Sequence, residues 1–173
     1  MKRIFIAIKI EAGMELQRMT TNLKALLGNE SIKWVDFRNL HLTLVFLGDT
    51  DKRRIASLIS LLNDKCSGFG EFEFTLAGTG VFRNFRDPRV IWAGINQHKE
   101  LIRLGEIIIN ALREKGYDFD EKPLRPHITL GRIKSIRDIQ NLKKIMEKYC
   151  NVELQIVNVK EVILFESILK QTG

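Results

Sequence analysis

Two short His-x-Thr motifs contain the residues of this sequence that are best suited to chemistry. His41 precedes Thr43 by two positions, and His127 precedes Thr129 by the same spacing. Side chains alternate between the two faces of a β-strand, so each motif would present one imidazole and one hydroxyl on a common surface. An imidazole exchanges protons near neutral pH, and a hydroxyl can donate a hydrogen bond to a phosphate oxygen.

Two imidazoles and two hydroxyls in one cleft suit an in-line displacement at a phosphodiester. One neutral imidazole would take a proton from the attacking oxygen, and the other, protonated, would give a proton to the leaving oxygen. The residues alone do not say which histidine has which role. We expect no metal ion and no other cofactor, because two histidines without carboxylate or thiolate neighbours make a poor metal site.

The two motifs lie 86 positions apart, and the same offset aligns the segments that precede them. It brings similar residues of a strand and a helix into register: Arg3 with Arg89, Ala7 with Ala93, Leu23 with Ile109, and Leu26 with Leu112. The sequence therefore predicts an internal duplication, covering about residues 1–80 and 87–166, with pseudo-twofold symmetry. The third histidine, His98, has no threonine two positions later and is predicted to be a non-catalytic residue at the start of a helix.

Hydrophobic periodicity predicts an alternation of strands and helices along the chain. Segments rich in β-branched and aromatic residues predict strands at 3–10, 34–36, 41–47, 72–76, 89–95, 127–132, 152–157 and 161–166. Apolar residues at helical spacing predict helices at 14–27, 51–65, 99–115 and 136–149. The loop 83–88 is predicted to be a hinge between the two halves.

These elements predict an α+β fold in a single domain spanning residues 1–173. We expect two pseudo-symmetric lobes, each an antiparallel sheet with helices on its outer face. The two histidines would lie on adjacent central strands, one per lobe, and a central cleft would carry both His-x-Thr motifs. Three large aromatic residues are expected to pack mainly in the core, with the alternative that one of them lines a binding pocket: Phe5, Trp34 and Trp92.

Composition limits the classes of protein that this chain can represent. Hydrophobic residues make up 45% of the 173 residues and charged residues 28%, which supports a sizeable core and excludes global disorder. The net charge of +7 suits a phosphate-rich partner, although a solvated basic surface would explain it equally well. The longest apolar run, residues 4–8, is too short to span a membrane or to form a leader peptide. Two distant cysteines without metal or disulfide spacing suggest the reducing cytoplasm.

The two motifs and their surroundings resemble a known superfamily, the two-histidine (2H) phosphoesterases. Within it, the sequence is most similar to the RNA 2′,3′-cyclic phosphodiesterases, which are also called 2′-5′ RNA ligases. Asn39-Leu-His-Leu-Thr-Leu-Val-Phe-Leu-Gly48 and Arg125-Pro-His-Ile-Thr-Leu-Gly-Arg132 resemble the two motifs of that family. The first strand and residues 80–82 and 88–94 resemble other family segments, so the resemblance runs nearly from end to end.

The resemblance implies an activity and a role for each motif residue. Members of the family hydrolyse a terminal RNA 2′,3′-cyclic phosphate to a 2′-phosphomonoester without a metal ion. By this resemblance His41 would be the proton donor to the leaving O3′, and His127 would be the proton acceptor that activates water. Thr43 and Thr129 would hold the phosphate. The implied substrates are RNA ends or nucleotide 2′,3′-cyclic phosphates, with tRNA halves among the candidates.

Three further residues near the motifs are candidates for contact with the substrate. Arg132 follows His127 by five positions, so a regular strand would place it on the opposite face, and phosphate contact requires a β-bulge or a strand end. Phe46 follows His41 by five positions and would either stack on a base or pack in the core. Arg125 would either contact the substrate or stand as a charge at the rim of the cleft.

Other functions are compatible with the same sequence. The chain could act as a reversible 2′-5′ RNA ligase on tRNA halves. It could also be a binding module for nucleotides or RNA ends that does not catalyse a reaction. Intact histidine and threonine at both motifs favour catalysis, because a pure binding protein could lose one imidazole. We expect a monomer in the cytoplasm that does not associate with membranes.

Overall fold

A computed structural model describes residues 1–97 and 99–168 of the chain, so His98 lies outside the described residues. Its strands are β1 (Lys2–Lys9), β2 (Ser31–Trp34), β3 (His41–Thr50), β4 (Phe72–Phe82), β5 (Val90–Asn96), β6 (Ile128–Ser135), β7 (Glu153–Val159) and β8 (Ile163–Glu166). Its helices are α1 (Met14–Leu26), α2 (Ile55–Cys66), α3 (Lys99–Glu114) and α4 (Ile139–Tyr149), with short 3-10 turns at Phe37–Asn39 and Lys52–Arg54. The predicted elements are present, except that the strand expected at 34–36 is instead β2, which ends at Trp34, and β4 continues six residues beyond its predicted end.

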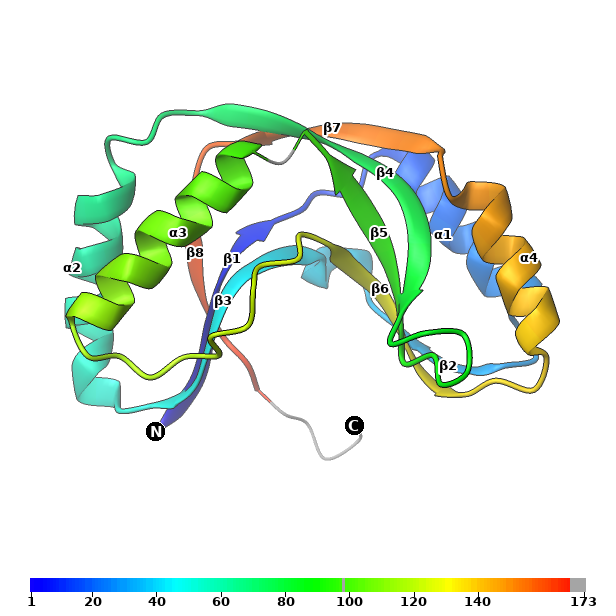
Figure 1. Ribbon diagram of the computed structural model, residues 1–173, viewed down its shortest axis with the longest axis horizontal. Coiled ribbons are helices and arrows are strands. Elements are labelled where there is room, and N and C mark those ends of the chain that lie inside the picture. The colour runs from blue at the N-terminus through cyan, green and yellow to red at the C-terminus, as the bar shows by residue number, and fades with distance from the viewer. Residues whose placement is uncertain (98, 169–173) are drawn as a thin grey trace.

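The strands form a curled antiparallel sheet whose outer faces are covered by the helices (Figure 1). The strand order is β7-β4-β5-β6-β3-β1-β8, and β2 pairs with β6 beside this path. The α+β class and the outer position of the helices, both predicted from the sequence, are confirmed. β3 begins at His41, and β6 begins one residue after His127; the two strands are neighbours near the centre of the sheet, as predicted.

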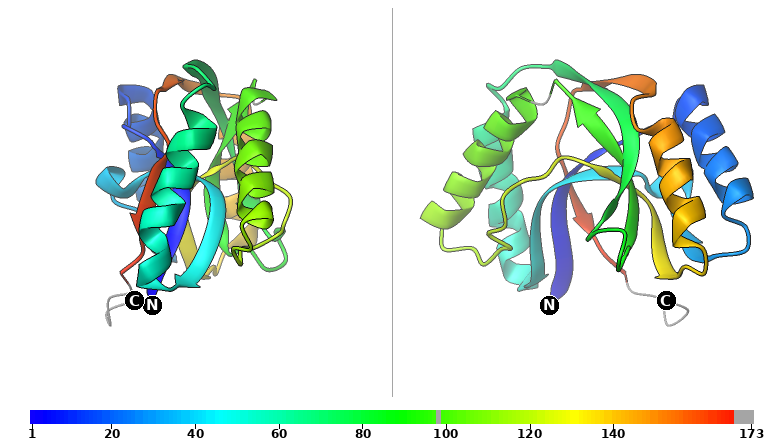
Figure 2. Two further views of the ribbon diagram at one scale, coloured as in Figure 1. Left: turned by 90° about the vertical axis from the view of Figure 1, so that its left-hand side faces the viewer. Right: turned by 45° about the vertical axis from the view of Figure 1, so that its right-hand side comes forward.

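The two halves of the sheet meet at a single residue pair, Leu42 opposite Ile128. The prediction of two separate sheets is therefore refined, because β3 and β6 join them into one. The strands diverge on either side of this pair, and Figure 2 shows the strong curl that results. Leu42 and Ile128 are equivalent residues of the predicted repeat, so its pseudo-twofold axis would pass through their contact.

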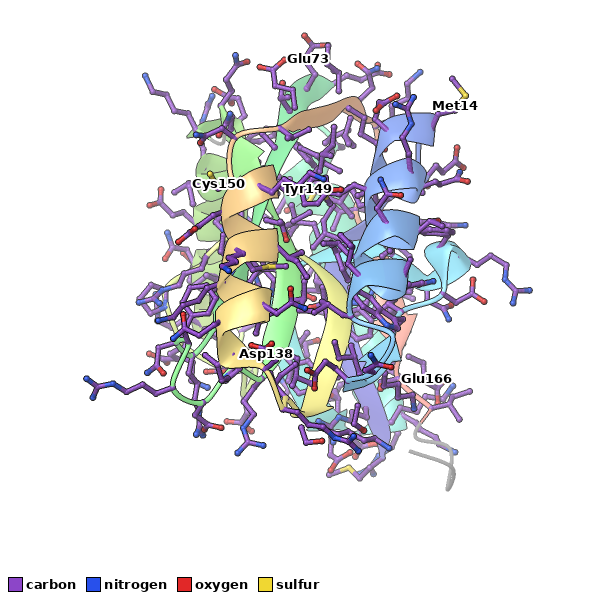
Figure 3. The ribbon with its side chains drawn as sticks, turned by 90° about the vertical axis from the view of Figure 1, so that its right-hand side faces the viewer. Met14, Glu73, Asp138, Tyr149, Cys150 and Glu166 are labelled. Carbon is purple, nitrogen blue, oxygen red and sulfur yellow. The ribbon has the colours of Figure 1, made fainter. Side chains whose placement is uncertain are left out.

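Each layer of helices combines one helix from each half of the sequence. Helix α2 lies beside α3 at one side of the sheet, and α1 lies beside α4 at the other (Figure 1). Figure 3 shows the second pair, in which the side-chain amide of Asn22 on α1 donates a hydrogen bond to the Tyr149 hydroxyl at the end of α4. Under the offset of 86, α1 corresponds to α3 and α2 to α4. The lobes are therefore not the two halves of the sequence.

The loop 83–88 does not separate the lobes, so the predicted hinge is wrong. It connects β4 to β5, which pair directly up to Phe82 opposite Val90. A loop between two paired neighbouring strands closes a hairpin within one part of the sheet. The sequence suggested a hinge because arginine, asparagine and proline concentrate there, and this composition is equally typical of a hairpin loop.

Helical spacing of apolar residues fixes how the helices pack on the sheet. On α1 the buried residues are Leu16, Met19, Thr20 and Leu23, and on α3 they include Leu101, Leu104, Ile108 and Leu112. Each large aliphatic side chain buried in this way contributes about 1.5–3 kcal/mol relative to exposure. No helix among the described residues is long and apolar enough to cross a membrane.

Candidate active site

The pairing of β3 with β6 brings the two His-x-Thr motifs together. Antiparallel pairing through Leu42 and Ile128 places His41 beside Thr129, and Thr43 beside His127. Leu42 and Ile128 are fully buried in the core, so the motif side chains point to the opposite, concave side of the sheet. Both histidines are half-buried. The pairing therefore brings the residues of both motifs to one side of the sheet.

A β-bulge follows each motif at the equivalent position. In β3, Ala7 is opposite Thr43 and Ile6 is opposite Val45, so the extra residue is Leu44. In β6, Thr129 is opposite Trp92 of β5 and Gly131 is opposite Ile91, so the extra residue is Leu130. A bulge shifts the alternation of side chains by one position.

The two bulges return the next side chains to the face of the histidines. Leu44 and Val45 are both buried, and Phe46 then faces the concave side, where it lines the cavity that contains His41. Leu130 and Gly131 are likewise buried, and Arg132 lines the same cavity. The irregularity that phosphate contact by Arg132 requires is therefore present in β6.

Two cavities adjoin at the motifs and share Thr43 and Phe46. The first, of about 620 Å³, is lined by His41 and Arg132 together with Arg3, Phe5, Lys9, Arg38, Asn39, Leu40 and residues 165–168. The second, of about 710 Å³, is lined by His127 and Arg125 together with Leu44, Val45, Phe82, Arg83, Asp120, Lys122, Pro123 and Leu124. Among the residues that the structure describes, the lining of neither cavity includes Thr129.

Each imidazole is oriented by a backbone carbonyl two residues before it. The Nδ1 atom of His41 lies 2.7 Å from the carbonyl oxygen of Asn39, and that of His127 lies 2.7 Å from the carbonyl oxygen of Arg125. A carbonyl oxygen only accepts hydrogen bonds, so Nδ1–H is the donor in both pairs. The Nε2 atom of each ring is left to exchange a proton with a substrate.

The surroundings of His127 bear on its protonation. Burial lowers the pKa of His127, and the positive charges of Arg132 and His41 lower it further, while the hydrogen bond to the Arg125 carbonyl acts in the opposite direction. His127 is therefore held in the neutral form at neutral pH, as a proton acceptor must be.

Aromatic rings enclose both imidazoles, and sequence reasoning missed most of them. The ring of Phe82 meets His127 edge-on, with centroids 4.7 Å apart. On the other side, Phe5 and Phe165 lie 4.9 Å and 6.0 Å from His41. Phe5 was expected mainly in the core, and it lines the first cavity, which was the alternative for this residue. Its alternation with the buried residues Ile4 and Ile6 could have indicated this position.

The two tryptophans remain packing residues, as expected. Trp34 lies against Gly131, and the indole of Trp92 lies across Gly80, where an added Cβ would be only 2.4 Å from the ring. The charged residues of the first cavity are mostly cationic: Arg3, Lys9, Arg38 and Arg132, against the single carboxylate of Glu166. Within residues 1–97 and 99–168, no three His, Cys, Asp or Glu side chains gather as a metal-binding group.

Comparison with known proteins supports the same interpretation. The family model described as LigT like Phosphoesterase matches residues 6–92 and 94–173, which together cover nearly the whole chain. The chain belongs to this family. The two matched ranges divide this LigT-like phosphoesterase near the point at which the predicted repeat divides it, while an ancestral duplication remains a prediction.

Relatives of this LigT-like phosphoesterase carry a common name. A Thermotoga maritima protein named RNA 2′,3′-cyclic phosphodiesterase is 34% identical over 99% of this chain and 89% of its own length. A protein of the same name from Archaeoglobus fulgidus is 31% identical over 99% of this chain and 94% of its own length. Among solved structures, E. coli LigT complexed with 3′-AMP has a TM-score of 0.73 and 26% identity, covering 98% of this chain and 90% of LigT.

Proposed function

We propose that this chain is an RNA 2′,3′-cyclic phosphodiesterase that opens a terminal cyclic phosphate to a 2′-phosphomonoester. The relatives named above carry this activity in their names. The observation that carries the proposal is the pair of carbonyl-oriented imidazoles, His41 and His127, on two strands that meet between them. Each ring keeps its Nε2 atom free for proton transfer, and the two cavities that the rings line share Thr43 and Phe46.

The reaction is an in-line displacement with two coupled proton transfers. Nε2 of neutral His127 accepts a proton from water, and the water oxygen forms a bond to phosphorus. The bond between phosphorus and O3′ breaks, and Nε2–H of protonated His41 donates its proton to O3′. The product carries a 3′-hydroxyl and a 2′-phosphate, and proton exchange with solvent restores both imidazoles.

The environment of His127 supports this order of roles. Burial and two nearby positive charges favour the neutral form of His127, which is the form that a general base needs. The order inferred from family resemblance and the order inferred from burial are therefore the same.

The remaining site residues are proposed to bind the phosphate and the nucleoside. Thr43 lines both cavities, and its hydroxyl would donate to a non-bridging phosphate oxygen, as Thr129 would from the opposite strand. Arg132 would make charge-assisted hydrogen bonds to the same oxygens. Arg125 would contact the substrate from the second cavity. Phe46, which lines both cavities, would contact it from the boundary between them.

We further propose that the physiological substrates are RNA ends, with tRNA halves among them, and that the enzyme works as a monomer in the cytoplasm. The binding of 3′-AMP by E. coli LigT supports recognition of a nucleotide by this fold. The net charge of +7 supports a polyanionic substrate. Turnover of tRNA halves bearing a cyclic phosphate, compared with mononucleotides, tests the preference, and light scattering tests the monomer.

Turnover of adenosine 2′,3′-cyclic phosphate by single histidine variants tests the proposed function. His41→Ala and His127→Ala should each lower kcat by at least ~100-fold, which is the usual contribution of a positioned acid or base. His98→Ala is the matched control, because this histidine belongs to neither motif, and it should retain turnover. Wild-type turnover in either motif variant would contradict the proposal, and so would the absence of turnover in the unmodified enzyme.

A further inference from the structure

The first cavity has an aromatic wall that the chemical step does not use. Phe46 on β3, Phe5 on β1 and Phe165 on β8 are directly opposite one another on three neighbouring strands. Their rings are stacked in sequence, with centroid separations of 6.4 Å between Phe46 and Phe5, and 5.2 Å between Phe5 and Phe165. We call these three residues the aromatic row. All three line the cavity that contains His41.

The aromatic row ends at the edge of the sheet, beside the proposed proton donor. β8 is the last strand in the sheet order, so Phe165 is the outer member of the row. Its ring lies 6.0 Å from the imidazole of His41. A hydrogen bond from the Ser167 amide to the Arg3 carbonyl and the ion pair between Lys2 and Glu166 hold this end of the chain against β1.

The proposed chemistry determines which part of the substrate enters this cavity. His41 donates its proton to O3′, which belongs to the ribose of the terminal nucleotide. Of the two cavities described, only the first is lined by His41. The terminal nucleoside therefore lies in the first cavity, within reach of Phe165, and the attacking water approaches from the side of His127.

We propose that Phe165 is the stacking surface for the base of the terminal nucleotide, and that residues 165–168 form the base-binding wall of the site. This inference rests on the proposed function and adds the specificity determinant. Stacking on an aromatic ring accepts all four bases, because every base has a π-face, so the wall would favour a nucleoside without selecting its sequence. Ile168, which is 77% exposed and lines the same cavity, would extend the apolar wall beyond the strand.

A comparison of two substrates separates base stacking from any structural role of Phe165. One is adenosine 2′,3′-cyclic phosphate, and the other is 1-O-methylribose 2′,3′-cyclic phosphate, which lacks the base. The unmodified enzyme should have a KM about tenfold or more higher for the baseless substrate, from the loss of one stacked base. In Phe165→Leu the KM for the adenosine substrate should rise by about the same factor, whereas kcat and the KM for the baseless substrate should stay near wild type.

Two further variants complete the test. Phe165→Tyr keeps an aromatic face and should restore the KM for the adenosine substrate. Phe72→Leu is the matched control, because its ring packs edge-on against Phe69 and lines neither of the two cavities at the motifs, and both KM values should be unchanged. Equal effects of Phe165→Leu on both substrates would overturn the inference, since they would show a structural role, and so would unchanged KM values.

The failure of the proposed function would be distinguishable from the failure of this inference. If the unmodified enzyme turned over neither substrate, the proposed function would be wrong. Calorimetric binding of adenosine 2′-phosphate and ribose 2′-phosphate would then decide the inference by itself. A preference for the adenosine ligand that disappears in Phe165→Leu would support base stacking, and a preference that persists would overturn it.

Discussion

Arg132 offers a quantitative test of how the bulge in β6 serves the reaction. It reaches the cavity of His41 only because the extra residue Leu130 shifts the alternation of the strand. A hydrogen bond to a charged group contributes about 1.5–3 kcal/mol. Arg132→Ala should therefore lower kcat/KM by about 10- to 150-fold, since each 1.4 kcal/mol corresponds to a factor of ten.

The same substitution should also change the pH dependence. The positive charge of Arg132 helps to lower the pKa of His127, so removing it raises that pKa. His127 acts as a base only when it is neutral, and it becomes protonated below its pKa. The acidic limb of kcat/KM should therefore move to higher pH in Arg132→Ala. Burial is the larger cause of the lowered pKa and remains in the variant.

The assay is kcat/KM for a 2′,3′-cyclic nucleotide, measured across a pH range that includes both limbs of a bell-shaped profile. We expect both limbs of the wild-type profile between about pH 5 and 8, because both groups are histidines. Arg132→Lys keeps the charge and should leave the acidic limb in place, while it loses the forked geometry that suits phosphate. Arg18→Ala, an exposed arginine on α1, is the control. Wild-type kcat/KM with an unmoved limb in Arg132→Ala would refute the assigned role.

Two further substitutions test the surroundings of the site. Phe82→Ala removes the ring that meets His127 edge-on, so water reaches the imidazole and the pKa of His127 should rise. The acidic limb of the pH–rate profile should then move to higher pH. An unmoved limb would show that this ring does not provide the burial. Gly80→Ala places a Cβ against the indole of Trp92 and should cost about 1–3 kcal/mol, lowering Tm by roughly 2–12 °C in a thermal melt. Gly68→Ala, with nothing within 4 Å, is its control, and equal melting of the two variants would contradict the packing argument.

Much of the site could be predicted because its residues repeat. The spacing of His41 and His127 placed both imidazoles on one face of adjacent strands without reference to any structure, and the structure confirms that β3 and β6 are neighbours. The need for a bulge before Arg132 could also be stated in advance, because strand alternation has a period of two. The local sequence pattern was sufficient to predict a side chain's position wherever that position depends on contacts within one strand or between equivalent strands of the repeat.

Features that depend on distant contacts could not be predicted in the same way. Helical periodicity shows which face of α1 is buried, but it does not show that α1 packs beside α4 instead of its sequence neighbour α2. Phe82 and Phe165 escaped notice because a single aromatic residue in a strand is usually a core residue. Their importance depends on which histidine each ring meets, and that depends on the pairing of strands.

Product analysis on an RNA that ends in a 2′,3′-cyclic phosphate tests the two-histidine mechanism most directly. The reaction is run in excess EDTA, and the terminal phosphate is assigned by phosphorus NMR. The mechanism predicts complete conversion to the 2′-phosphomonoester by the wild-type enzyme and almost no product with His127→Ala. A 3′-phosphomonoester product, or activity that is lost in EDTA and restored by a divalent metal ion, would contradict it.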